Sequence, residues 1–394
     1  MSFKGKRVLI LEGYARQSLP FIREFKKQGC IVSVLCDSKL DVAYASRLPD
    51  YKIIGVCNPE RYDETVSCVR ELLKTRRYDM VLPLVDFSAK ILSTNKAEFS
   101  NYTKVASNDK EVFDKSQDKL SVMMECMSNS IPCPRTAINI KNFEDILNSD
   151  LVFPIIIKPR RECGASGFIY IKDEVELQEY IMGLDISLED YVVQELIPQD
   201  DLNLSCNLFI DNNGEVKSCF IYASHRWFPL EGGTGTFNTT IYREDVKETC
   251  IKLAKLMNLR GAVGVDLIHD PRDNVAKVLE INPRIMACAQ IGFDAGVNQA
   301  QQILENELGN EVTSMMNYKN NISIRMTQAD ILWFLKSKDR FNTKPSWFKI
   351  KNTKDQIFDI KDPLPWFSFT LQAIARYKSK MHKKGSKTVL NTSK

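Results

Sequence analysis

A strand that ends in two oxygen-bearing side chains constrains the fold of this chain more than any other feature. Residues 275–281 are mostly apolar, and Glu280 and Asn282 lie two positions apart at the end of this run. Successive side chains of a strand point to opposite faces, so these two project from the same face. A carboxylate and a carboxamide supply the oxygen ligands that a hard divalent cation binds. The pattern predicts a magnesium site, with manganese as the alternative ion.

The segment before this strand reads as its hairpin partner. Residues 262–268 are apolar around Asp266, and a stretch rich in turn-forming residues joins the two runs. If His269 faces Val275, Asp266 lies diagonally beside Glu280 and becomes a third oxygen ligand. On this segment alone, a partly exposed hairpin whose acidic side chains face water is an equal alternative.

Composition limits the class of protein. A chain of 394 residues with 44% hydrophobic and 26% charged residues predicts two or three globular domains. No apolar run approaches the roughly 18 residues that span a bilayer, so we predict a cytoplasmic protein. The 11 cysteines form no C-x-x-C pair and there are three histidines. This excludes a disulfide framework, a thiolate zinc site and a histidine-rich metal site.

The positive charge is concentrated at the C-terminal end. Residues 376–394 contain seven Lys or Arg and no acid, and subtracting seven from the net charge of +4 leaves −3 for the rest. A global nucleic-acid surface is therefore not predicted. The tail is either a solvated end or a weak contact to an anionic membrane surface.

The first hundred residues alternate between strand and helix patterns. These patterns occupy residues 7–11, 21–28, 30–35, 62–76 and 80–85. The alternation predicts a doubly wound α/β domain over residues 1–105. It has neither a G-x-G-x-x-G motif nor a P-loop, so dinucleotide binding is not predicted.

The next two hundred residues predict an α+β body with largely antiparallel sheets and helices on one side. A helix is expected at residues 115–127. Strands are expected at 154–158, 168–172, 191–195, 204–210, 217–223, 262–268 and 275–281. Beyond about residue 312 the sequence is irregular and aromatic until a helix-like stretch that ends near Lys380.

A lysine and a loop of small residues follow the first of these strands. Lys158 ends the strand, and Gly164, Ala165, Ser166 and Gly167 lie just beyond it. Glycines let backbone amides approach anionic oxygens, while Ser166 adds a hydroxyl and Lys158 a positive charge. The alternative is a flexible hairpin turn with an exposed lysine.

A β-branched strand then runs into an extended linker. Gln194, Glu195, Leu196 and Ile197 stand at the strand end, where backbone groups could pair with the edge of an adenine. Asp201 beyond it could accept hydrogen bonds from ribose hydroxyls. Taken alone, this is a strand end followed by a solvated loop.

A polar, glycine-rich segment lies between these parts. It contains Arg226, Gly232, Gly233 and Thr234. We predict that it lines a substrate pocket, because the guanidinium fork suits a carboxylate and the small residues expose backbone donors. The alternative is a mobile loop with a surface arginine.

The order of these parts resembles the ATP-grasp superfamily, in particular its carboxylate-amine ligase branch. The resemblance covers about residues 1–310. It rests on Asp118-Lys119, Ile-Pro-Cys-Pro134, Lys158 with its loop, Val-Gln-Glu195-Leu-Ile-Pro, Gly-Val-Asp266 and Leu-Glu280-Ile-Asn282-Pro-Arg284.

The resemblance implies a set of roles. Lys119 and Lys158 would hold ATP phosphates under the loop Gly164–Gly167, with Glu195 and Leu196 at the adenine and Asp201 at the ribose. Asp266, where glutamate is common, would bind magnesium with Glu280 and Asn282, and Arg284 would lie beside a reacting acyl phosphate. The implied domains are a pre-ATP-grasp domain at 1–105, a small lobe at 106–195, a large lobe at 196–312 and a C-terminal extension at 313–394.

The function implied is an ATP- and magnesium-dependent ligase that joins a small-molecule carboxylate to an amine. Two alternatives are carboxylase-type activation of bicarbonate, for which no biotin-carrier segment is visible, and a nucleotide-binding subunit without catalysis. A homo-oligomer is left open. The aromatic stretch after Asp362 either packs on the body or docks at a membrane surface.

Overall fold

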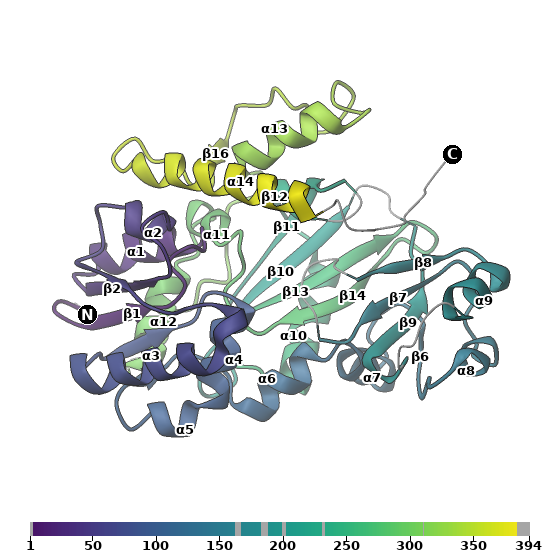
Figure 1. The fold of residues 1–394 in the computed structure, drawn as a ribbon, viewed down its shortest axis with the longest axis horizontal. Coiled ribbons are helices and arrows are strands. Elements are labelled where there is room, and N and C mark those ends of the chain that lie inside the picture. Colours follow the sequence, from purple (N-terminus) through teal and green to yellow (C-terminus); the bar gives the residue numbers. More distant parts are fainter. Residues whose placement is uncertain are drawn as a thin grey trace.

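The computed structural model describes residues 3–161, 167–182, 188–198, 202–230, 233–309 and 311–383. Figure 1 shows three sheets: an N-terminal sheet at the left, a long sheet in the centre and a small sheet at the right. The C-terminal helices lie across the top of the molecule.

The N-terminal domain is doubly wound, as predicted. Its five parallel strands have the order β3-β2-β1-β4-β5. They are β1 (Arg7–Ile10), β2 (Ile31–Cys36), β3 (Tyr51–Ile54), β4 (Met80–Leu82) and β5 (Lys104–Val105), with helices α1 (Ser18–Lys27), α2 (Val42–Ala45), α3 (Tyr62–Arg76), α4 (Asp86–Thr94) and α5 (Lys96–Phe99). Alternate residues of β1 serve the two faces: Val8 packs with the core beside α1, and Leu9 packs with the core beside α3.

The central sheet has seven strands in the order β14-β13-β10-β11-β12-β15-β16. They are β10 (Asn203–Ile210), β11 (Val216–Phe228), β12 (Thr234–Ile241), β13 (Gly261–Asp270), β14 (Val275–Asn282), β15 (Ser323–Arg325) and β16 (Thr353–Asp355). All neighbours are antiparallel except β15 and β16. The prediction of largely antiparallel pairing is therefore confirmed.

Helices cover both faces of the central sheet, so the prediction of helices on one side was wrong. One face packs on α6 (Lys110–Gln117), α7 (Lys119–Ser128) and α10 (Glu244–Leu256). The other packs on α11 (Gln290–Ala295), α12 (Gln299–Glu307) and α13 (Thr327–Lys336). Phe209 of β10 and Ile303 of α12 share one core with Val8 and Phe21 of the N-terminal domain. That core holds the N-terminal domain against the central sheet.

The small sheet carries the strand that ends in Lys158. Its antiparallel order is β6-β9-β7-β8. The strands are β6 (Thr136–Ala137), β7 (Ile155–Pro159), β8 (Ile169–Ile171) and β9 (Tyr191–Glu195), covered by α8 (Phe143–Leu147) and α9 (Glu174–Met182). The single helix expected at 115–127 is two helices, because Asp118 ends α6 and caps α7 by accepting a hydrogen bond from the Leu120 amide at 3.1 Å.

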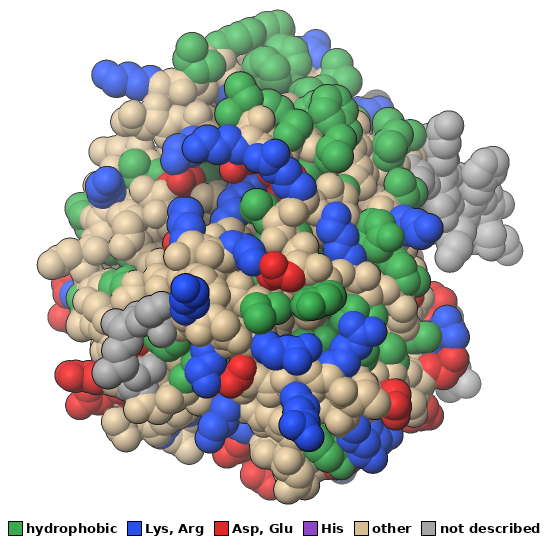
Figure 2. Space-filling view, turned by 90° about the vertical axis from the view of Figure 1, so that its left-hand side faces the viewer, with side chains coloured by type: hydrophobic (Ala, Val, Ile, Leu, Met, Phe, Trp, Pro, Cys, Tyr) green, Lys and Arg blue, Asp and Glu red, His purple; other side chains and the backbone are tan. Residues whose placement is uncertain are grey.

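The segment after residue 312 extends the central sheet and packs on the N-terminal domain. Strands β15 and β16 extend the central sheet, and α14 (Leu364–Lys383) packs on α2 of the N-terminal domain. Asp362 fixes the start of α14 by accepting hydrogen bonds from the Ser46 hydroxyl and, at 3.1 Å, from the Arg47 amide. Figure 2 shows the left-hand side of the molecule, where hydrophobic side chains gather in the upper part, the level of α13 and α14 in Figure 1.

None of the described helices is long and apolar enough to cross a membrane.

Candidate functional site

The hairpin β13–β14 pairs Asp266 directly with Glu280. The predicted register, with His269 opposite Val275, was wrong, because Asp270 faces Val275. A register shift between Asp266 and Leu267 then leaves Leu279 as an extra residue on β14. The bulge brings the two carboxylates opposite each other rather than on a diagonal.

Asp266, Glu280 and Asn282 form a polar cluster in which Asn282 is buried and the two carboxylates are partly buried. The Asn282 amide donates to the Asp266 carboxylate at 2.9 Å, and the Ser205 hydroxyl donates to its other oxygen. Burial and the neighbouring Glu280 raise the pKa of Asp266 to about 6. In the described ranges no three His, Cys, Asp or Glu side chains come together as a metal site. A cation at this position would therefore rely on two carboxylates and an amide oxygen.

Two buried lysines face this cluster from two other elements. Lys119 begins α7, and its Nζ lies 3.3 Å from Glu280 Oε2. Lys158 is 5% exposed near the end of β7. Burial lowers the pKa of Lys158 to about 8, with Lys119 acting in the same direction and Glu280 opposing it. Residues from three separated parts of the chain thus meet at one place, and Lys158 and Glu280 lie on the same side of the molecule.

An ion pair joins the two lysine-bearing elements. The Asp118 carboxylate accepts from Arg160 Nε at 2.9 Å, and the Lys119 amide donates to the Arg160 carbonyl at 3.0 Å. Arg160 follows β7 directly, so these bonds hold the start of α7 against the end of that strand. The spacing between Lys119 and Lys158 is therefore fixed by the fold.

Arg284 links the cluster to the N-terminal domain. Its Nη2 donates to Asn282 Oδ1 at 2.9 Å and to Asp86 Oδ2 at 2.7 Å. Asp86 begins α4, which follows the C-terminal end of β4. In an open α/β sheet this edge, where β1 lies between β2 and β4, is where ligands bind.

At the end of β9, some backbone and side-chain groups already have hydrogen-bond partners and others could still bind a ligand. The Leu196 amide already donates to the Pro154 carbonyl at 3.0 Å, and the Glu195 carboxylate accepts from Arg272 Nη2 at 2.8 Å. Gln194 is buried, and its amide nitrogen donates to Thr136 at 2.7 Å. Among the described residues its Oε1 has no partner. Of the predicted adenine contacts in the described ranges, Gln194 therefore retains an unused acceptor.

Some predicted site residues lie outside the described residues. They are Gly164, Ala165, Ser166, Asp201 and Gly232. Gly167 is described and has a φ of +75°, a conformation that favours glycine.

Arg226 does not line a pocket as predicted. Its guanidinium is fully buried and ion-paired with Asp330 of α13 at 2.8 Å, and it also donates to the Pro345 carbonyl at 2.9 Å. It stacks over Phe237, 4.2 Å from the ring centroid. A substrate carboxylate would have to displace these partners, so the structure gives Arg226 a structural role instead.

Gly233 lies directly before β12, and Thr234 is the first residue of that strand; both are exposed. A Cβ at Gly233 would lie 2.3 Å from the Phe228 carbonyl, so only glycine fits this position. The segment predicted as a loop is thus mostly the end of one strand and the start of the next. Substrate contact by these two residues stays a prediction.

Sequence reasoning missed one buried carboxylate. Glu12 follows β1 with a φ of +60° and is fully buried. It accepts from the Val85 amide at 3.0 Å and from the Ser88 hydroxyl, and burial raises its pKa to about 7. Its hydrogen-bond donor Val85 is the residue directly before Asp86. A single glutamate after a strand carries no sequence signal that could have found it.

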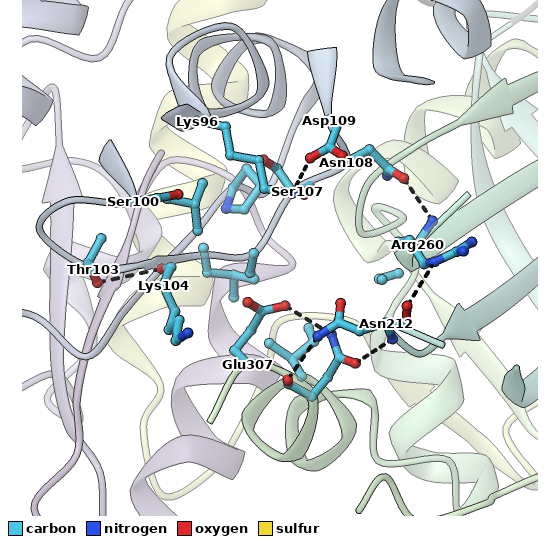
Figure 3. A pocket seen from close by; sticks show the side chains of 18 of the residues that line it. Lys96, Ser100, Thr103, Lys104, Ser107, Asn108, Asp109, Asn212, Arg260 and Glu307 are labelled. Carbon is cyan, nitrogen blue, oxygen red and sulfur yellow. Dashed lines mark hydrogen bonds and ion pairs between the residues drawn. The ribbon is translucent and has the colours of Figure 1, made fainter. Parts of the chain in front are cut away.

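A cavity of about 930 Å³ lies between β5, α12 and the segment after β14 (Figure 3). Its charged side chains are largely matched, as in Lys96 with Asp109 at 2.8 Å and Lys6 with Asp79 at 2.9 Å. It touches Arg284 but none of Lys119, Lys158 and Glu280. The cavity is therefore separate from the cluster of lysines and carboxylates and shares only Arg284 with its surroundings.

Residues 116–288 match the family described as the ATP-grasp domain. The match spans both lysines, the hairpin and Arg284. This part of the chain is similar to the ATP-grasp domain. The matched residues contain the small sheet and most of the central sheet. The match therefore confirms the fold class predicted from the motifs.

Two relatives among curated proteins are ligases by name. D-aspartate ligase of Enterococcus faecium is 23% identical over 272 residues, which are 64% of this chain and 63% of that protein. Tetrahydromethanopterin:alpha-L-glutamate ligase of Methanocaldococcus jannaschii is 24% identical over 204 residues, 50% of this chain and 68% of that protein. The chain thus spans less than two thirds of the length of the first.

Two solved structures share the fold of this chain. The biotin carboxylase domain of 2-oxoglutarate carboxylase from Hydrogenobacter thermophilus, in complex with MgADP and bicarbonate, has a TM-score of 0.67 at 16% identity, covering 81% of this chain and 73% of its own. N5-carboxyaminoimidazole synthetase from Staphylococcus aureus has a TM-score of 0.64 at 18% identity, covering 82% and 83%.

Proposed function

We propose that this protein is an ATP-dependent ligase that joins a carboxylate to an amine through an acyl phosphate and releases ADP and phosphate. The observation that carries the proposal is the convergence of Lys119 and Lys158 on the carboxylates Asp266 and Glu280. The two buried lysine ammonium groups carry the positive charge that a polyphosphate needs. Two carboxylates next to them suit the cation that accompanies it.

The donor set fits a magnesium ion. Burial first, and the neighbouring Glu280 second, raise the pKa of Asp266, and a divalent cation would favour the charged form of both carboxylates. Asp266, Glu280 and Asn282 would hold the ion, and manganese would meet the same oxygen ligands. When bound, the ion neutralises phosphate charge.

The base would bind at the end of β9. The unpartnered Oε1 of Gln194 can accept a hydrogen bond from the amino group of adenine, and the Ile197 amide can donate to a ring nitrogen. Leu196 would contribute side-chain packing, since its amide is already bonded. Glu195 would act indirectly, because Arg272 holds its carboxylate.

The chemistry follows from the charges that the chain supplies. A carboxylate oxygen attacks the γ-phosphorus, the bond to ADP breaks, and Lys119 and Lys158 stabilise the charge on the phosphoryl oxygens. The amine then attacks the acyl carbon, phosphate leaves with the carboxylate oxygen, and the amine loses a proton. Arg284 is placed to stabilise the acyl phosphate and the tetrahedral adduct.

The names of the curated relatives favour an amino acid as one substrate. One relative is named for D-aspartate and the other for L-glutamate. Both are ligases, which favours ligation over bicarbonate activation or nucleotide binding alone.

An isotope experiment tests the proposal. Purified protein receives ATP, magnesium and pairs of amino acids and small carboxylates, with the carboxylate oxygens labelled with ¹⁸O. We expect ADP release that requires both partners, with one labelled oxygen in each phosphate. Unlabelled phosphate from productive pairs would contradict an acyl phosphate, and no ADP release with any pair would favour a binding subunit.

The activity should fall at alkaline pH. Lys158 has a pKa of about 8 in place of the ordinary 10.5, so its positive charge is lost as the pH rises through 8. We expect kcat/KM for ATP to fall by about tenfold per pH unit above this value, because this ratio reports the free enzyme. Lys158→Arg is the matched variant, since a guanidinium stays charged and should remove this limb. A level profile up to pH 9.5 in the unchanged protein would contradict the role of Lys158.

Several expectations from the sequence stay predictions. They are the domain limits, the cytoplasmic location, the absence of nucleic acid partners, a homo-oligomer and membrane contact by the basic tail.

A further inference from the structure

The C-terminal part of the chain has more exposed large hydrophobic side chains for its length than the rest of the described protein. Of the 23 large hydrophobic side chains that are exposed in the described residues, 11 lie between residues 331 and 374. We call these eleven the apolar surface. Its members are Ile331, Leu335, Phe341, Phe348, Ile350, Phe358, Ile360, Leu364, Phe367, Leu371 and Ile374. Exposed apolar surface concentrated in this way marks an interaction site.

Helix α14 shows that the exposure is organised. Its buried face packs on the N-terminal domain, where Ser368 donates to the Leu40 carbonyl and Trp366 packs on a core with Val42. Leu364, Phe367, Leu371 and Ile374 follow at spacings of three and four residues, so they form one stripe on the helix. The stripe is 49% to 60% exposed. The helix is therefore apolar on a face that the described protein leaves uncovered.

The parts of the apolar surface are held together by side-chain contacts. Gln328 of α13 donates to Thr370 of α14 at 2.9 Å. Phe334 of α13 packs on Phe341 and Phe348, with ring centroids 5.4 and 6.1 Å apart. Figure 2 shows the hydrophobic side chains together in the upper part of this face, with Lys and Arg beside them.

Charge decides which partner fits. Residues 331–394 contain 15 Lys or Arg and four Asp, a net charge of +11, so residues 1–330 carry −7 of the total of +4. Three of the four acids are engaged by the protein. Asp355 accepts from the Phe358 amide at 2.7 Å, Asp359 pairs with Arg23 at 3.4 Å, and Asp362 accepts from the Arg47 amide at 3.1 Å. Lysines remain exposed around the apolar surface at positions 336, 338, 344, 351 and 361.

We propose that the apolar surface and its lysines dock this protein onto an anionic lipid membrane, with α14 lying in the plane of the interface. Seven of the eleven side chains are aliphatic and the other four are Phe, a composition that suits insertion among acyl chains. A symmetric dimer through this surface would place two cationic patches against each other. Residues 384–394 add Lys to the same end of the chain and contain only Val389 and Leu390 as apolar residues, too few to cover the surface.

Vesicle flotation with the full chain tests the proposal. Vesicles of phosphatidylcholine with phosphatidylglycerol are compared with phosphatidylcholine alone, at low and physiological salt. We expect binding to the anionic vesicles that weakens with salt. The double variant Phe367→Gln/Leu371→Gln should lose at least about tenfold in partition, because two inserted side chains are removed. The matched control Val175→Gln/Leu256→Gln, which changes exposed apolar residues of α9 and α10, should bind as the unchanged protein does.

The lysines are tested separately. We expect Lys338→Gln, Lys351→Gln and Lys361→Gln each to weaken binding about fivefold, the change that corresponds to about 1 kcal/mol per cationic side chain near an anionic surface. Equal partition of the stripe variant and the unchanged protein would overturn the proposal. So would equal binding to neutral vesicles, or a dimer in solution that the stripe variant abolishes. ADP release without vesicles should be unaffected, so the result is independent of the proposed ligase activity.

Discussion

The Glu280→Gln variant should lose at least about a hundredfold in turnover, the effect of about 3 kcal/mol of barrier. The substitution keeps the size of the side chain but removes the charge that faces Lys119 at 3.3 Å and pairs across the hairpin with Asp266. It takes away one carboxylate from a cation site that has two. Turnover is measured as ADP release, and the magnesium concentration at half-maximal rate should rise in the same variant.

A surface variant separates this effect from a general loss of stability. Glu248→Gln, on the exposed side of α10, makes the same chemical change away from the cluster and should leave turnover as it was. Circular dichroism should show both variants folded. Near-normal turnover of Glu280→Gln would remove the metal assignment, whatever the isotope experiment shows.

The Asp330→Asn variant should lower the free energy of unfolding by about 3 to 5 kcal/mol, as expected when one partner of a buried ion pair is removed. Asp330 is fully buried and accepts hydrogen bonds from Arg226 at 2.8 and 3.1 Å and from Thr236 at 2.8 Å. It is also ion-paired with Arg325 at 3.2 Å. The amide would leave the buried guanidinium of Arg226 without a counter-charge. Urea unfolding followed by tryptophan fluorescence measures the change.

Two further variants distinguish a structural from a substrate-binding role for Arg226. Arg226→Met/Asp330→Leu replaces the pair by apolar side chains and should regain part of the lost stability. Arg226→Lys, which cannot form the planar fork, should be less stable with an unchanged KM for each substrate. A raised KM with unchanged stability would instead restore the sequence-based assignment of Arg226 to a substrate carboxylate.

The parts of the site that local pattern could predict are those at strand ends. Lys158 and Glu280 stand where an apolar run stops, and alternation along the strand decides which face their side chains take. Asn282 follows from the same alternation. Their convergence was not visible locally, and only the family resemblance pointed to it.

The parts that could not be predicted depend on distant contacts. The bulge at Leu279 arises from cross-strand pairing, and the partner of Arg226 lies 104 residues away in α13. Strand β12 is absent from the predicted strands because it is rich in Thr, Gly and Asn. Thr236, Asn238 and Thr240 are buried there and bonded to side chains or backbone of the fold, which compensates their polarity.

The bond between Arg284 and Asp86 has a consequence for where rate is controlled. In the state described, a carboxylate of the N-terminal domain holds the guanidinium that is placed to meet a reacting acyl group. Each turnover would then require this arginine to release one anion and take up another. Asp86 of α4 would thereby influence the rate of the reaction through the release of Arg284. The N-terminal domain would then affect the rate of turnover in addition to forming one side of the site.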